Sequence, residues 1–173
     1  SFTGFRECHC SLRPNLAILA ILPFPPLSPM NFRAALAEGI GTFVLTFLVF
    51  TSLAIEFPLA TPVIAGLTLG TFVYIIGGIS GAHINPAVTL ALFSIGKIKK
   101  NDAVLYIVAQ IVGALVAMAL GQTVTGGDTG IVGGDTSYDI LGEVIGAAML
   151  LLGISAVVAE RTPKDAAGLT IGV

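Results

Sequence analysis

The side chains that could do chemistry in this sequence are few, and most stand inside long apolar runs. Glu38, Glu143 and Gln110 each lie among apolar residues, where a polar group is costly in lipid and usually functional. His83 and Asn85 lie in a short interruption of another apolar run. No arrangement of these residues forms a nucleophile with its base or a metal cluster. We therefore expect these residues to act by hydrogen bonding, with no enzymatic activity, no metal and no cofactor.

The interruption is the stretch Ser80-Gly81-Ala82-His83-Ile84-Asn85-Pro86-Ala87-Val88-Thr89. Pro86 is suited to the first position of a helix, and Asn85 is suited to the cap before it. The apolar run 86–95 gives a helix of roughly 15 Å, which is half of a hydrocarbon core roughly 30 Å thick. Irregular backbone at membrane depth is tolerated only where protein buries it or where it lines a wet cavity. The stretch therefore predicts a re-entrant half-helix at a pore or binding site near the midplane.

The composition is that of an integral membrane protein. The chain of 173 residues is 55% hydrophobic and only 10% charged, against about 25% charged residues in soluble domains. Its mean hydropathy is +0.97. The net charge of -2 gives no indication of a nucleic-acid partner. We expect the lipid bilayer as a partner and no nucleic acid.

The elements that must position these residues are apolar segments long enough to cross a bilayer. Small residues in the second of them suit close helix packing in lipid. A further segment at 166–173 resembles the opening of a fifth span. The predicted complete spans are 34–55, 62–79, 102–124 and 138–159.

Residues 1–29 differ from the remainder, because several prolines prevent a long helix there. We predict that they are a disordered leader or a non-native extension, and that Met30 is the natural start. Cys8 and Cys10 flank His9, but no further ligands complete a metal site. We interpret them as an incidental pair. Residues 30–173 form the predicted channel domain.

The Lys and Arg residues after Met30 lie before the first predicted span or in connections between spans. With a half-helix that returns to its own side, every Lys and Arg after Met30 falls on one face of the membrane. By the positive-inside rule that face is cytoplasmic, so the N-terminus is predicted to be cytoplasmic in a multi-pass protein of the cell membrane. The residues concerned are Arg33, Lys97, Lys99, Lys100, Arg161 and Lys164.

Two matches in the same order indicate an internal repeat. Glu38-Gly39-Ile40-Gly41 matches Glu143-Val144-Ile145-Gly146, and 65–70 (AGLTLG) matches 167–172 (AGLTIG). Three spans per unit would place the second copy upside down in the membrane, as an inverted repeat. The second break would then fall beyond Val173, so we expect the repeat to be incomplete and the chain to be truncated.

Residues 30–173 resemble the aquaporin and glycerol-facilitator family, the major intrinsic proteins. The resemblance rests on the stretch from Ser80 to Thr89, on Ala37-Glu38 with Gly41-Thr42-Phe43, on Ala109-Gln110 and on the Glu143 repeat. It implies an all-α bundle of spanning helices with re-entrant half-helices that meet at the midplane. It also implies a homotetramer with one pore in each subunit.

The half-helix start is the predicted centre of the pore. Asn85, with Pro86 and Ala87 after it, would offer amide donors to a permeant oxygen, and the helix dipole adds partial positive charge at the same point. Backbone carbonyls of Gly81, Ala82 and His83 would form a ladder of acceptors. We interpret the His83 side chain as a structural histidine of the loop, with a proton relay as the alternative. The resemblance places Ala65 in the narrow filter, where its small side chain leaves the substrate open.

Three buried polar residues are predicted to support the pore loop. Repeat symmetry suggests that Glu38 and Glu143 each accept hydrogen bonds from the backbone of a re-entrant loop. Proton coupling and simple hydration near the interface remain alternatives for both. Gln110 would cross-link to the same loop or hydrogen-bond between helices.

The leading interpretation of function is a passive channel for water or a small neutral solute such as glycerol. The alternative is an ion- or proton-coupled secondary transporter, since such proteins also use broken helices and inverted repeats. A third interpretation is that a truncated fragment of this length conducts nothing.

Overall fold

The computed structural model describes residues 31–55, 58–127 and 136–172, and within these ranges every regular element is helical. The predicted leader 1–29 lies outside the described residues. The elements in chain order are α1 Phe32–Ala54, α2 Thr61–Ser80, α3 Pro86–Ser94, α4 Lys100–Thr125, α5 Thr136–Val158, the 3-10 turn η1 Lys164–Ala166 and α6 Ala167–Gly172.

Local sequence sets where these helices begin and end. The side chain of Asn31 accepts a hydrogen bond from the Ala34 N–H at 3.2 Å and so caps α1. Pro62 stands in the first turn of α2, where its missing N–H costs nothing. Gly81 and Gly126 follow α2 and α4 in the left-handed conformation, with φ of 92° and 75°. This is the usual glycine termination of a helix.

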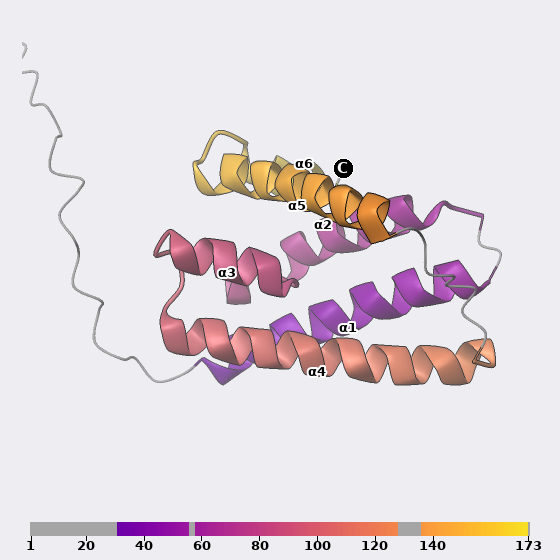
Figure 1. The fold of residues 1–173 in the computed structure, drawn as a ribbon. Helices are drawn as coiled ribbons and strands as arrows, with labels where there is room; N and C mark the ends of the chain where they lie inside the picture. Colours follow the sequence, from indigo (N-terminus) through magenta and orange to yellow (C-terminus); the bar gives the residue numbers. More distant parts are fainter. Residues whose placement is uncertain (1–30, 56–57, 128–135, 173) are drawn as a thin grey trace, which may run out of the picture.

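The helices pack side by side as one bundle, and α3 is much shorter than the long helices next to it (Figure 1). The helix α1 lies between α2 and α4, α2 packs on α6, and α3 lies between α4 and α5. Four helices, α1, α2, α4 and α5, are long and apolar enough to cross a membrane. Large apolar side chains such as Leu115 and Met149 are exposed on their outer faces. A surface of this kind suits lipid, and the protein is an all-α, multi-pass membrane protein.

The two matching repeat segments pack directly against each other. A Cβ added at Gly70 would lie 2.6 Å from the carbonyl oxygen of Gly168, and one at Gly66 would collide with the carbonyl oxygen of Gly172. The collisions are reciprocal, because Gly168 and Gly172 meet the carbonyl oxygens of Gly70 and Gly66 in turn. Reciprocal contact between equivalent positions is the pattern of a two-fold axis. The α2–α6 contact therefore joins two equivalent helix surfaces, and the glycines on both of them allow the two backbones to approach closely.

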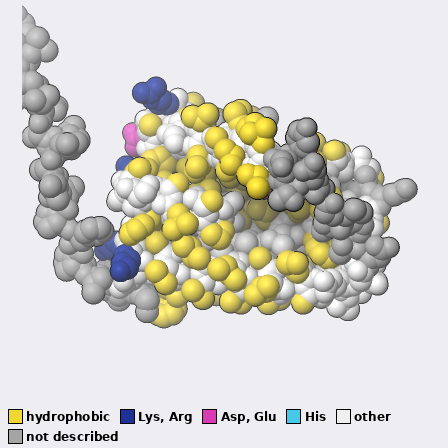
Figure 2. All heavy atoms as spheres, viewed as in Figure 1, with side chains coloured by type: hydrophobic (Ala, Val, Ile, Leu, Met, Phe, Trp, Pro, Cys, Tyr) yellow, Lys and Arg dark blue, Asp and Glu magenta, His cyan; other side chains and the backbone are white. Residues whose placement is uncertain are grey.

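The Lys and Arg residues on the visible face lie at one end of this bundle. Figure 2 shows the Lys and Arg side chains of the visible face at the left end of the molecule, with apolar side chains over the remainder. The same end holds the C-termini of α3 and α5 and the N-termini of α1 and α4 (Figure 1).

Candidate functional site

The helix α3 is far too short to cross a bilayer beside its neighbours. Its nine residues give about 14 Å of helix, whereas the 26 residues of the adjacent α4 give about 39 Å. The chain enters α3 deep in the bundle and leaves it at the charged end, where a short connection leads to α4 (Figure 1). The N-terminus of α3, with its partial positive charge, therefore points into the interior of the bundle.

Asn85 caps this helix directly before Pro86. Its Oδ1 accepts a hydrogen bond from the Ala87 N–H at 2.8 Å. This bond assigns the side-chain oxygen to the helix and turns the Nδ2 amide away from it. No described residue accepts a hydrogen bond from that amide in the structure. The position thus combines an N–H donor with the positive end of a helix.

The loop before Asn85 holds an unusual backbone conformation. Gly81, Ala82 and Ile84 have φ values of 92°, 51° and 50°. A positive φ is costly for a residue with a Cβ, and most costly for a β-branched residue such as Ile84. Such a conformation persists only where the surroundings impose it. We therefore looked for the groups that hold this loop.

The carboxylate of Glu38 on α1 holds the loop by hydrogen bonds. It is fully buried, and Oε1 accepts the Ser80 hydroxyl at 2.5 Å and the His83 N–H at 2.9 Å. Oε2 accepts the Ile84 N–H at 2.6 Å and the Gln110 amide at 2.9 Å. Four donors around one carboxylate satisfy a buried charge that would otherwise be prohibitively expensive.

Gln110 and Thr89 extend this network to the half-helix. Both are fully buried, and Gln110 Nε2 donates to Thr89 Oγ1 at 3.1 Å as well as to Glu38. Thr89 Oγ1 donates to the Asn85 carbonyl at 3.1 Å and lies 3.1 Å from Nδ1 of His83. The Gln110 side chain thus contacts both α1 and α3, and links the carboxylate to the half-helix.

The side chains of His83 and Tyr106 are further members of this network and contact each other. The His83 ring is 7% exposed and meets the Tyr106 ring edge-on, with centroids 5.3 Å apart. Tyr106 donates its hydroxyl to the Ser80 carbonyl at 3.0 Å. These contacts place the His83 side chain in a packed environment beside the loop.

Sequence reasoning assigned no role to Ser80, which donates to the Glu38 carboxylate, nor to three further members of this network. Thr42 donates to the carbonyls of Glu38 and Ile84 at 2.8 and 3.3 Å, and Thr89 and Tyr106 make the contacts described above. Each of the three lies four residues from a residue that was predicted: Thr42 from Glu38, Thr89 from Asn85, and Tyr106 from Gln110. Residues four apart share one face of a helix, so this spacing was the available signal.

Two predicted residues lie apart from the network. Glu143 is exposed on α5 and is not among the residues that hydrogen-bond to the loop 81–85. Ala65 is half-buried in the first turns of α2. The structure therefore brings Glu38 and Gln110 to the loop, and leaves Glu143 and Ala65 elsewhere.

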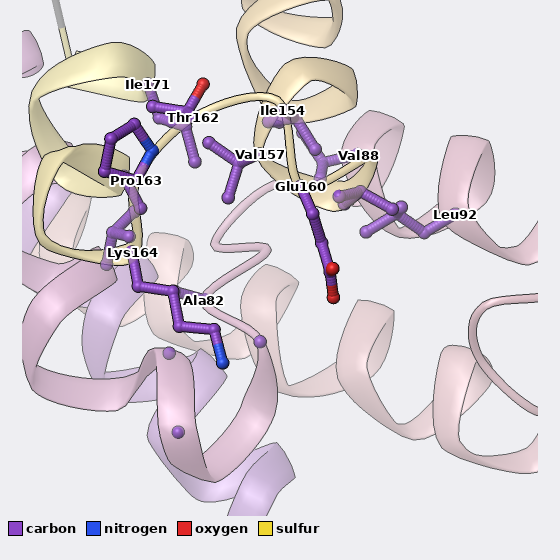
Figure 3. A pocket seen from close by; sticks show the side chains of 16 residues that line it. Ala82, Val88, Leu92, Ile154, Val157, Glu160, Thr162, Pro163, Lys164 and Ile171 are labelled. Atoms are coloured by element: carbon purple, nitrogen blue, oxygen red, sulfur yellow. The ribbon is translucent and has the colours of Figure 1, made fainter.

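A cavity of about 670 Å³ opens between the loop, α2, α3 and the α5–α6 connection (Figure 3). Gly81 and Ala82 line it beside Gly77 and Gly78 of α2. Asn85, Pro86, Ala87, His83 and Ala65 are not among its lining residues. On its other sides lie Val88, Leu92, Ile154, Val157, Glu160 and Lys164. Within the described ranges, no group of three or more His, Cys, Asp or Glu residues could hold a metal ion.

Four apolar helices, with a half-helix packed against two of them, define a multi-pass membrane protein with a polar site inside its bundle. Residues 27–173 match the family model described as "Major intrinsic protein". The chain belongs to this family, which is a family of channels. The resemblance seen in the sequence is thereby confirmed.

Relatives of this chain carry channel and facilitator names. It is 33% identical over 157 residues to Aquaporin AqpM of Methanothermobacter marburgensis, covering 84% of this chain and 58% of that protein. It is 37% identical over 153 residues to Glycerol uptake facilitator protein-like 6 of Lactiplantibacillus plantarum, covering 82% and 71%. Aquaporin Z of Photorhabdus laumondii is 29% identical over 167 residues, covering 82% and 72%. The chain thus spans less than two thirds of the length of the first of these relatives.

Proposed function

We propose that this protein is a passive transmembrane channel for water or small neutral solutes such as glycerol. The observation that carries the proposal is the start of α3. There Asn85 has its oxygen bound to the helix and its amide donor without a partner among the described residues. An amide donor and a helix dipole together favour an oxygen lone pair and disfavour a cation. The names of the relatives in both the aquaporin and the glycerol-facilitator groups support the solute class.

Glu38 and Gln110 act in this proposal as supports of the pore loop. Their hydrogen bonds to the loop and to Thr89 hold the positive-φ backbone that aims α3. Glu143 would support a second re-entrant loop in the same way, by the repeat. Because donors from the protein itself occupy both oxygens of the Glu38 carboxylate, it offers no free oxygen to a coupling ion. This argues for a channel and against a coupled transporter.

The proposal also gives roles to the remaining predicted pore residues. Gly81, Ala82 and His83 would present backbone carbonyls to the permeant, and Gly81 and Ala82 line the cavity. Ala65 would form part of the narrow filter. We propose no enzymatic activity, a homotetrameric assembly, and a place in the cell membrane. The basic residues at one end of the bundle support a cytoplasmic N-terminus.

Swelling of proteoliposomes that hold the native protein tests this function. We expect water or glycerol flux above that of empty vesicles, and the same flux with and without a proton or sodium gradient. Flux that needs either gradient would identify a coupled transporter instead. Flux equal to that of empty vesicles would refute the proposal and favour a non-conducting chain.

A further inference from the structure

The backbone of Ile84, the residue directly before Asn85, is held by α1 at two points. Its N–H donates to Oε2 of Glu38 at 2.6 Å, and its carbonyl accepts the Thr42 hydroxyl at 3.3 Å. Its φ of 50° is unfavourable for a β-branched residue, so the local sequence alone would not adopt it. The conformation therefore depends on the partners that α1 supplies.

The side chain of Ile84 packs against α1 and α2. It is 2% exposed and belongs to a cluster with Ala37, Ile76 and Ala82. Space for it on α1 exists because residue 41 is glycine. A Cβ at Gly41 would lie 3.1 Å from Cδ1 and from Cγ1 of Ile84, and 3.2 Å from Cδ1 of Ile76. At such distances a neighbouring side chain has to move.

Asn85 itself makes its hydrogen bonds to described residues within α3. Its Oδ1 accepts the Ala87 N–H, and its carbonyl accepts the N–H and the hydroxyl of Thr89. The position of Asn85 relative to α1 therefore depends on its chain neighbours. Ile84 fixes it directly from one side, and Thr89 fixes it from the other side through Gln110.

The loop lies between α1 and the cavity. Gly81 and Ala82 line the cavity, whereas none of the described residues of α1 is among its lining. A methyl group added at Gly41 would displace Ile84 away from α1, because the helix backbone cannot give way as readily as a loop. The loop would then shift toward the cavity.

We propose that Ile84 is a positioning residue that sets the distance of the loop and of Asn85 from α1 through its contact with Gly41. This inference rests on the proposed channel function, because that distance affects permeation only if solutes pass the loop. A loop displaced toward the cavity narrows it, and a narrower pore excludes solutes larger than water first.

The test adds one methyl group at Gly41 and removes one at Ile84, in proteoliposomes of the native protein. For Gly41→Ala we expect a lower permeability ratio of glycerol to water. We also expect amide exchange at Ile84 to accelerate at least about fivefold, as for an overpacked contact. Ile84→Val lacks Cδ1, so the double variant conserves volume. It should bring both measurements back to within about twofold of wild type.

Two controls separate this contact from overpacking in general. Gly121→Ala crowds Phe50 in the other half of α1, since its Cβ would lie 2.5 Å from the Phe50 ring. We expect it to leave the permeability ratio unchanged. Ile76→Val removes the other atom near a Cβ at position 41. Combined with Gly41→Ala, it should not restore the ratio, because Ile84 stays displaced.

Restoration by Ile84→Val and not by Ile76→Val supports the inference. An unchanged ratio in Gly41→Ala, restoration by Ile76→Val, or an equal change in Gly121→Ala would each overturn it. If Gly41→Ala alone does not fold, the double variant with Ile84→Val must fold and conduct as wild type does, and its failure overturns the inference.

The failure of the inference differs from the failure of the proposed function. Wild-type vesicles without water or glycerol flux would refute the channel function, and this inference with it. Wild-type flux together with any of the contrary results in the variants refutes only the inference.

Discussion

Replacing Glu38 by Gln is the most direct test of how the re-entrant loop is held. The substitution keeps the size of the side chain and removes its charge. Each carboxylate oxygen accepts two hydrogen bonds, Oε1 from Ser80 and His83 and Oε2 from Ile84 and Gln110. Whichever oxygen becomes the amide nitrogen, two donors lose their acceptor, and at least one of them is a backbone N–H of the loop.

The cost follows from the burial of this site. A buried donor left without a partner costs about 1–3 kcal/mol. Ser80 is half-buried and also donates to the Ile76 carbonyl, so the less costly orientation of the new amide strands one buried donor, the His83 N–H, and costs about 1–3 kcal/mol. Glu38 is fully buried, so water does not replace the lost partner. Even the lower value changes a local opening equilibrium by about fivefold, at 1.4 kcal/mol for each factor of ten. The loop also stores the strain of its positive-φ residues, which favours opening once the anchor weakens.

Amide hydrogen exchange of the reconstituted protein measures this local opening. We expect peptides that contain His83 and Ile84 to exchange at least about fivefold faster in Glu38→Gln, with α2 and α4 changed far less, and water flux to fall. Asp165→Asn is the control, because it removes one exposed carboxylate outside the network. Exchange within about threefold of wild type at these two amides would refute the reasoning, since by the estimate above a lost anchor must show as more. Uniform acceleration of all helices would refute it as well.

Further substitutions test other parts of the site. Asn85→Asp should weaken the exclusion of cations, because a carboxylate offsets the positive end of α3; an unchanged proton and cation leak in vesicles would count against the mechanism. Ala65→Phe should narrow the pore and reduce glycerol flux, and an unaffected flux would mean that Ala65 is not in the filter. Gly66→Ala should lower the stability of the protein by about 1–3 kcal/mol in thermal unfolding, because its Cβ would collide with the Gly172 carbonyl. Gly78→Ala, which meets nothing within 4 Å, should not; equal losses in the two variants would contradict the close α2–α6 contact.

Several features of the fold were predicted correctly from the sequence. Apolar length and low charge predicted an all-α membrane protein, and the helices and the family match confirm this. The predicted half-helix at 86–95 corresponds to α3 at Pro86–Ser94. The predicted spans 34–55 and 102–124 correspond to α1 and α4, each of which begins two residues earlier. Helix ends in lipid are marked weakly by hydropathy, because capping groups such as Asn31 lie outside the apolar run.

The sequence predicted several residues of the candidate site but few of the hydrogen bonds between them. Buried polar residues in apolar runs stand out, so Glu38 and Gln110 were found. The other members of the network, Ser80, Thr42, Thr89 and Tyr106, did not stand out, because serine, threonine and tyrosine are common in apolar helices and their roles depend on what lies opposite. Glu143 shares its sequence signal with Glu38, yet it is exposed on α5. Identical local sequence therefore does not ensure an identical environment.

The sequence by itself determined that this chain is helical, lies in a membrane and breaks at Asn85-Pro86. These properties follow from hydropathy, length and the conformational limits of single residues, which are local. Only the tertiary structure decided that one carboxylate would receive four donors from three elements, and that Ile84 would pack against Gly41. Contacts between residues 42 to 72 positions apart depend on how helices pack, and that packing is a property of the whole bundle.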